Sequence, residues 1–80
     1  MIEVKVRLYG TLRKYHSGKA IGEAAVLSVL EFTPLSALLK QINVPAEVVK
    51  LIFVNKQQKD VGYLLKDGDQ VAVFPPIGGG

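Results

Sequence analysis

The residues best suited to chemistry stand at the C-terminal end of the sequence, where three consecutive glycines close the chain. Gly78, Gly79 and Gly80 have no side chains, so this segment cannot pack a core or prefer one conformation. Its reactive group is the α-carboxylate of Gly80, carried on an arm slim enough to enter a narrow channel. We therefore expect Gly80 to be delivered into the active site of another protein.

The base of this arm is stiffer than its end. Pro75 and Pro76 favour an extended path. At roughly 3.3 Å per residue, residues 75–80 reach about 20 Å from the body. A frayed chain end is the alternative interpretation, because termini are often disordered. The sequence thus predicts a folded domain at residues 1–74 and a flexible tail at residues 75–80.

A carboxylate is a poor electrophile, so a partner must activate it, and an acyl adenylate made from ATP is the simplest route. An amine would then capture the acyl group as a conjugate, whereas a sulfur donor would convert it to a thiocarboxylate. The chain has no cysteine and so cannot itself store sulfur as a persulfide. The remaining alternative is a plain interaction module with an incidental tail.

No catalytic set or metal site is recognisable elsewhere. The single histidine, His16, falls in a predicted loop, and it alone would have to supply the base of any triad. Asp67 and Asp69 flank Gly68 in a turn that offers too few oxygen ligands for calcium. The glycines end the chain instead of preceding a helix, which excludes a phosphate loop. We expect no metal, no bound cofactor and no catalysis by the chain itself.

The composition is that of one small globular domain. The chain has 80 residues, of which 49% are hydrophobic and 21% charged. Its net charge of +3 is spread along the sequence, which favours an acidic protein surface over nucleic acid as partner. There is no apolar run long enough for a membrane span and no signal peptide. We expect a cytoplasmic protein that binds neither nucleic acid nor membrane.

Four segments have the apolar, β-branched composition of strands. The first is the clearest, because its apolar and polar residues alternate with a period of two. The four segments are residues 2–9, 23–30, 51–54 and 70–74. Residues 61–65 are either a short strand or an irregular apolar segment, and the polar residues 57–60 are expected to be exposed.

A single helix is predicted at residues 34–42. Thr33 is expected to cap it and Pro34 to occupy its first position. Asn43 is expected to end it. Its apolar stripe, at the spacing of one helix face, consists of Leu35, Leu38, Leu39 and Ile42. We expect this stripe to pack on the sheet.

The order of elements predicts an α+β body with a mixed sheet of four to five strands and one crossover helix at about residues 34–42. The first and last strands are expected in the middle of the sheet, parallel to each other. This arrangement is the β-grasp, or ubiquitin-like, fold, although the order of elements alone also permits other small α+β sheets.

Alternation also predicts what lies on the outer face of the sheet, away from the helix. Lys5 and Arg7 face outward there, beside an aromatic and apolar set close to the root of the tail. This set comprises Tyr9, Leu51, Phe53 and Phe74. Such a patch indicates a protein partner, although scattered exposed aromatics are also normal. The tail residues expected to join that contact are Pro75, Pro76, Ile77 and Gly78.

Four segments together resemble the small subunit of molybdopterin synthase. They are residues 4–13 (VKVRLYGTLR), 54–56 (VNK) and 65–77 (LKDGDQVAVFPPI), with the closing pair Gly79 and Gly80 matching the diglycine of ubiquitin-like sulfur carriers. The resemblance spans the chain and is weakest at residues 16–32. Thiamine-pathway sulfur carriers share the fold and diglycine but lack the Phe-Pro-Pro step.

The resemblance implies a sulfur carrier. An adenylating enzyme of the ubiquitin-activating type would use ATP on Gly80, and a sulfur-donor protein would convert it to the thiocarboxylate. The tail would then enter the large synthase subunit, in a heterotetramer, and give sulfur to a pterin precursor of the molybdenum or tungsten cofactor. The alternatives are conjugation of Gly80 to lysines as a protein modifier, and sulfur supply for thiamine. Gly78 departs from the family pattern, where a small side chain is usual.

Overall fold

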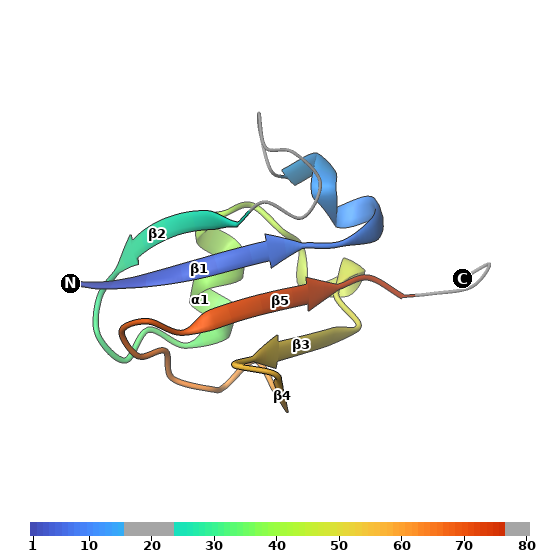
Figure 1. Cartoon of the computed structure of the whole chain (residues 1–80). Helices are drawn as coiled ribbons and strands as arrows, with labels where there is room; N and C mark the ends of the chain where they lie inside the picture. The colour runs from blue at the N-terminus through green and yellow to red at the C-terminus, as the bar shows by residue number, and fades with distance from the viewer. Residues whose placement is uncertain (16–23, 77–80) are drawn as a thin grey trace.

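The computed structural model describes residues 1–15 and 24–76 of the chain. Its five strands form one sheet in the order β2-β1-β5-β3-β4, and helix α1 lies against one face (Figure 1). The elements are β1 (Ile2–Leu8), the 3-10 helix η1 (Gly10–Tyr15), β2 (Ala25–Val29), α1 (Leu35–Gln41), the 3-10 helix η2 (Ala46–Val48), β3 (Leu51–Val54), β4 (Gln57–Lys59) and β5 (Gln70–Phe74). The predicted α+β architecture is confirmed.

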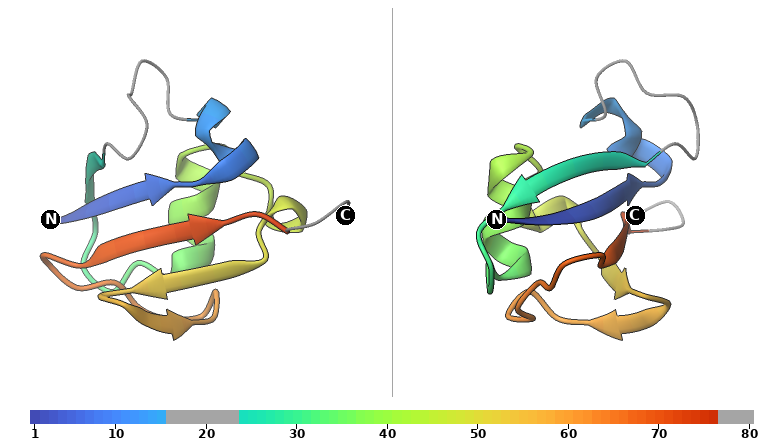
Figure 2. Two further views of the ribbon diagram at one scale, coloured as in Figure 1. Left: turned by 45° about the vertical axis from the view of Figure 1, so that its right-hand side comes forward. Right: turned by 60° about the vertical axis from the view of Figure 1, so that its left-hand side comes forward.

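The first and last strands run parallel through the centre of the sheet, as predicted (Figure 2). Their register places Lys5 opposite Gln70 and Leu8 opposite Val73. β2 pairs with β1 and β3 pairs with β5, both antiparallel. Both central strands therefore end on the same side of the sheet, and this is where the tail begins.

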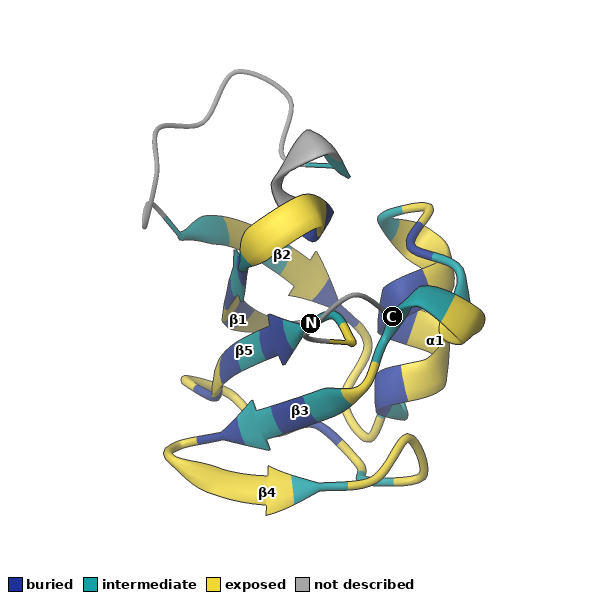
Figure 3. Ribbon diagram, turned by 90° about the vertical axis from the view of Figure 1, so that its right-hand side faces the viewer, coloured by how far each residue is buried: buried dark blue, intermediate teal, exposed yellow. Residues whose placement is uncertain are grey.

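The core lies between α1 and the sheet. Alternate residues of β1 are buried, and the stripe of α1 turns toward the strands (Figure 3). Leu35, Leu38 and Leu39 of the predicted stripe are buried, and Ile42 packs against the core at its margin. Within residues 1–15 and 24–76, no helix has the length and apolar character needed to cross a membrane.

The start of α1 differs from the prediction. The helix begins at Leu35, and Pro34 stands before it in an extended conformation with no side-chain cap. Thr33 instead donates its hydroxyl to the carbonyl oxygen of Leu30 at 2.6 Å. The first N–H groups of α1 bond to carbonyls of the irregular segment 61–65, since Leu35 donates to Tyr63 (2.9 Å). A capping side chain is unnecessary because backbone carbonyls already satisfy these donors.

The C-terminal side of α1 agrees with the sequence. Asn43 has a left-handed φ of 62°, the conformation in which a helix commonly ends. Residues 42–44 donate backbone N–H groups to carbonyls of the last turn. The helix thus stops at Gln41, one residue earlier than predicted.

The fifth strand is β4 and not residues 61–65. Asn55 and Lys56 both have left-handed φ, 53° and 70°, and form a two-residue hairpin turn between β3 and β4. The sequence analysis missed β4 because its residues are polar, as befits a short edge strand. In segment 61–65, pairing is limited to an isolated bridge between Leu64 and Pro34.

Candidate functional site

The end of β5 is held on both sides by backbone hydrogen bonds. Tyr9, just after β1, donates its N–H to the carbonyl of Val73 at 3.1 Å. Lys50, just before β3, donates its N–H to the carbonyl of Phe74 at 2.8 Å. The point at which the chain leaves the sheet is therefore fixed by both neighbouring strands.

Three rings cluster at this point. Tyr9 stacks on Phe74 with centroids 4.6 Å apart and planes 8° from parallel. Phe53 meets Phe74 edge to face at 5.7 Å and 88°. Leu51 is directly opposite Phe74 in the ladder. Tyr9, Leu51, Phe53 and Phe74 form what we call the aromatic patch. All four are half-buried and lie on the outer face, which confirms the predicted parity.

A glycine supports the root of the tail. Gly10 has a left-handed φ of 57°, and a Cβ there would stand 3.0 Å from Cγ of Pro75. That distance is shorter than normal van der Waals contact, so a side chain at this position would push the proline ring away. The sequence pattern gives no sign of this contact, because Pro75 is 65 positions away along the chain.

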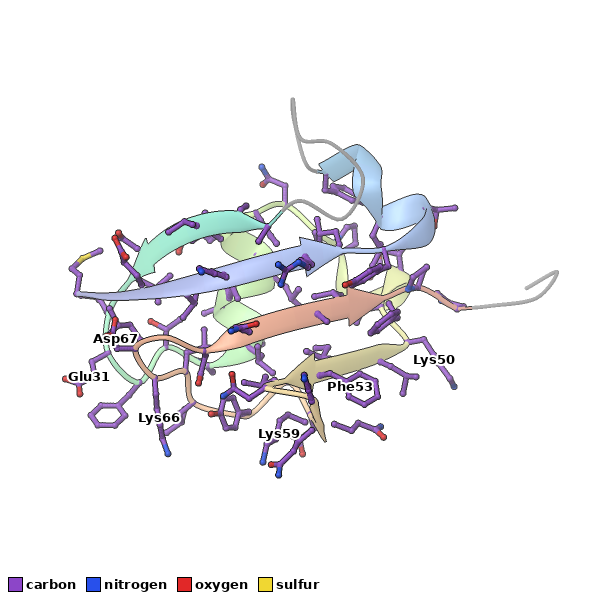
Figure 4. The ribbon with its side chains drawn as sticks, viewed as in Figure 1. Glu31, Lys50, Phe53, Lys59, Lys66 and Asp67 are labelled. Carbon is purple, nitrogen blue, oxygen red and sulfur yellow. The ribbon has the colours of Figure 1, made fainter. Side chains whose placement is uncertain are left out.

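Next to the aromatic patch the outer face is hollowed. Ala72 lies between Arg7 on β1 and Phe53 on β3 in the strand register. The small side chain between two long ones leaves a hollow of about 560 Å³. Phe53, labelled on β3 in Figure 4, is one of the residues that line it. Asn55 and Lys56 line its other end.

The start of β5 has a different construction, centred on the buried carboxylate of Asp69. Asp69 is 4% exposed. It accepts hydrogen bonds from Nδ2 of Asn55 (2.9 Å), the hydroxyl of Tyr63 (3.1 Å) and the N–H of Lys66 (2.8 Å). The sequence analysis expected Asp69 to be a turn former. It does flank the turn at Gly68 (φ 85°), but it also joins three segments.

Burial is the main cause that raises the pKa of Tyr63 above its usual value, and the hydrogen bond and charge of Asp69 raise it further. Ionising Tyr63 would remove the donor and place two negative charges side by side. The phenol is therefore held in its neutral, donating form beside the carboxylate.

Asn55 connects the Asp69 cluster to the hollow. Its amide group donates to Asp69 and its Oδ1 accepts the N–H of Gln70 at 3.0 Å. Its own N–H donates to the carbonyl of Gln70 at 2.9 Å. These bonds hold the Asn55–Lys56 turn in its left-handed conformation at the end of the hollow.

Several predicted site residues fall outside the described residues. They are Ile77, Gly78, Gly79 and Gly80. The loop predicted around His16 also lies outside them. Pro75 and Pro76 are described and follow β5 directly. Within residues 1–15 and 24–76, no group of three or more His, Cys, Asp or Glu side chains is placed to hold a metal ion.

The family model described as Mut7-C ubiquitin matches residues 1–78. Among curated proteins, the chain has no significant match. Among solved structures, a Pyrococcus furiosus protein assigned as subunit 1 of molybdopterin converting factor is 25% identical, with 96% of this chain and 100% of that chain covered and a TM-score of 0.75.

A chain of the complex of subunits 1 and 2 of molybdopterin-converting factor from Helicobacter pylori 26695 is also 25% identical, with 99% and 100% covered and a TM-score of 0.63. Small archaeal modifier protein 1 from Methanosarcina acetivorans is 23% identical, with 100% and 98% covered and a TM-score of 0.65. These likenesses confirm the ubiquitin-like β-grasp fold and the resemblance predicted from the sequence.

Proposed function

Because the chain belongs to the Mut7-C ubiquitin family, we propose that it is a sulfur carrier protein that presents the Gly80 carboxylate to partner enzymes. The chain is a carrier and not a catalyst. It acts in the cytoplasm, where ATP is available, and needs neither a bound cofactor nor a metal of its own. Gly79 provides the slim approach to Gly80 that a narrow active-site channel requires.

The observation that carries this proposal is the construction at the end of β5. Hydrogen bonds to Tyr9 and Lys50 fix the last strand residues, and Gly10 leaves room for Pro75. These contacts place Pro75, the first residue of the tail, directly beside the aromatic patch. A partner that docks on the patch would therefore find the tail within reach, which reduces the entropic cost of capturing it.

The chemistry is a three-step cycle on Gly80. The carboxylate attacks the α-phosphorus of ATP, pyrophosphate leaves and an acyl adenylate forms. Hydrosulfide supplied by a sulfur-donor protein then attacks the acyl carbon and AMP leaves, giving the thiocarboxylate. Finally, the thiocarboxylate sulfur attacks a carbon of the pterin precursor and displaces an oxygen substituent there. Water then attacks the acyl carbon of the resulting thioester, which leaves the sulfur on the pterin and restores the carboxylate.

The partners follow from this cycle. An adenylating enzyme of the ubiquitin-activating type carries out the first step, and a large molybdopterin synthase subunit receives the sulfur in a heterotetramer. The similarity to a chain of the two-subunit complex from Helicobacter pylori supports this second partner. We place Tyr9, Leu51, Phe53 and Phe74 in the contact, followed by Pro75, Pro76, Ile77 and Gly78 along the channel.

A second candidate function is protein modification, in which the Gly80 adenylate is captured by a lysine amine. The fold it shares with small archaeal modifier protein 1 favours this candidate. Both functions use the same activated Gly80 and differ in the nucleophile that follows.

The test is the intact mass of the full chain after incubation with ATP, the adenylating enzyme of the source organism and a sulfur source. A gain equal to the replacement of one oxygen by sulfur supports the sulfur carrier. Lysine-linked conjugates without that gain support the modifier. Neither product, with an enzyme active on a known carrier, would contradict both. The control lacks Gly80, and the starting mass checks that the native chain ends in a free Gly80 carboxylate.

A further inference from the structure

The shape of the hollow over Ala72 and the charges around it indicate which kind of partner docks on the outer face of the sheet. Ala72 is half-buried at its floor, with the aromatic rings of Tyr9 and Phe74 at the tail end and Asn55 and Lys56 at the other. Its volume of about 560 Å³ is enough for one or two apolar side chains of a partner. An apolar anchor seated in such a pocket is the usual centre of a protein interface.

The charges around the hollow have one dominant sign. Lys5 and Arg7 alternate onto the outer face of β1, and Lys56 lines the hollow itself. The ammonium groups of Lys5 and Lys56 make no ion pair with another described residue. Within the described strands, Glu3 is the one carboxylate on this face.

The other described acidic residues lie elsewhere. Glu31 and Asp67 are at the end of the molecule away from the root of the tail, as Figure 4 shows. Asp69 is buried and takes its three donors from within the fold. Glu47 is in η2 and Asp60 follows β4. The ammonium groups of Lys5 and Lys56 are therefore available to a partner.

The arrangement of the three rings disfavours nucleic acid as the partner. A single-stranded base binds by stacking on an open aromatic face. Here Tyr9 and Phe74 already stack on each other at 4.6 Å, and the edge of Phe53 packs against Phe74. These contacts occupy the ring faces between which a base would insert.

We propose that the partner of this face is an acidic protein segment, with an apolar side chain that enters the hollow over Ala72 and carboxylates that pair with Lys5 and Lys56. This deepens the proposed function and rests on it for the identity of the partner as an activating enzyme or large subunit. The paired charges set the orientation and raise the rate of association, and the apolar side chain supplies most of the affinity.

The experiment is a titration of the full-length, ¹⁵N-labelled chain, followed by its amide NMR signals. The probe is the capped peptide Glu-Asp-Gly-Leu-Gly-Asp-Glu, and its counterpart has lysine at every acidic position. The acidic peptide is expected to shift the signals of Arg7, Phe53 and Ala72 at low ionic strength and to lose this effect as salt is added. The lysine peptide is expected to leave these signals unchanged.

Variants sharpen the result. Lys56→Glu should weaken binding of the acidic peptide about fivefold, whereas Lys66→Glu, the same charge change at the far end, should not. Ala72→Leu should abolish the shifts by filling the hollow. If Ala72→Leu does not fold, the comparison of Lys56→Glu with Lys66→Glu still tests the proposal. Equal shifts with both peptides, equal effects of the two lysine variants, or shifts at these residues with oligouridylate instead of the acidic peptide would overturn the proposal.

Peptide binding does not require chemistry at Gly80. A chain that selects the acidic peptide but never forms a Gly80 adenylate would keep the docking surface and refute the carrier function. A chain that forms the thiocarboxylate but binds both peptides alike would support the carrier function and refute the acidic docking partner.

Discussion

The two ends of β5 are built from different kinds of interaction. At its start, the buried carboxylate of Asp69 accepts three hydrogen bonds from Asn55, Tyr63 and Lys66, and every one is internal to the fold. At its end, Phe74 is half-buried among rings on a surface that no described residue covers. The interactions at the start of β5 stabilise the fold. The half-buried rings at its end leave apolar surface exposed, which the stability of the fold does not require.

The residues that stabilise the fold and those that we assign to partner binding therefore lie at opposite ends of the same five-residue strand. Substitutions at the start of β5 should change the free energy of unfolding, because they break hydrogen bonds made by the buried carboxylate of Asp69. Substitutions at its end should act on partner binding, because the patch is held in place by backbone bonds that a side-chain change leaves intact. The predictions below test that separation, from the largest effect to the smallest.

The largest effect is expected for Asp69→Ala. It removes the buried acceptor of three hydrogen bonds, from Asn55, Tyr63 and Lys66, which should cost about 3 kcal/mol of unfolding free energy. Denaturant unfolding measures it. Asp67→Ala is the matched control, because Asp67 is exposed and accepts one bond, from the N–H of Glu3 at 2.9 Å. A similar loss in both variants would show that the Asp69 cluster is not a special source of stability.

The next effect concerns the root of the tail. Gly10→Ala introduces a Cβ at a left-handed φ and 3.0 Å from Pro75, and it should cost about 2 kcal/mol while also weakening partner binding. Gly68→Ala is strained in the same way, with φ 85°, but its Cβ would meet nothing within 4 Å. If Gly68→Ala weakened partner binding as much as Gly10→Ala, contact with Pro75 would not matter.

Phe74→Asp should weaken binding to the adenylating enzyme or large subunit by at least about tenfold and leave the body folded. Its control is Phe32→Asp, which changes a 60% exposed ring outside the aromatic patch. Isothermal titration calorimetry gives the affinity and circular dichroism the fold. Unfolding of the Phe74 variant, or equal binding losses in both, would contradict the assignment of the patch to recognition.

The smallest effect is a pH dependence. The folded-state pKa of Tyr63 is raised above its unfolded value of 10.0. Its contribution to stability is therefore complete below about pH 10 and is lost as pH rises through the higher folded-state pKa. Tyr63→Phe should be about 1 kcal/mol less stable at neutral pH, with the difference from wild type narrowing at alkaline pH. A constant difference across pH would show that Tyr63 does not titrate with unfolding.

The sequence predicted the elements whose pattern is local. Alternation in β1 and the leucine spacing of α1 fixed the parity of the sheet, and through it the outward positions of Phe53 and Phe74. The strand that follows Asn55 and Lys56 was missed, because a polar edge strand leaves no apolar pattern.

Contacts between distant residues were beyond the sequence. The hydrogen bonds of Asp69 span three segments, and Gly10 meets Pro75 only because β1 and β5 run parallel and end together. The cap predicted for Thr33 was wrong for the same reason, since carbonyls of segment 61–65 take the role of the capping side chain. The predicted partner role of the patch and the predicted chemistry of Gly79 and Gly80 remain to be measured.

The most direct test of the account is ATP–pyrophosphate exchange by the adenylating enzyme, because sulfur transfer and conjugation both require an adenylate on Gly80. We predict exchange with the full chain, none when Gly79 and Gly80 are removed, and weaker exchange with Phe74→Asp than with Phe32→Asp. Exchange that persists without Gly79 and Gly80, or that never occurs with the full chain and an enzyme active on a known carrier, would contradict the central claim.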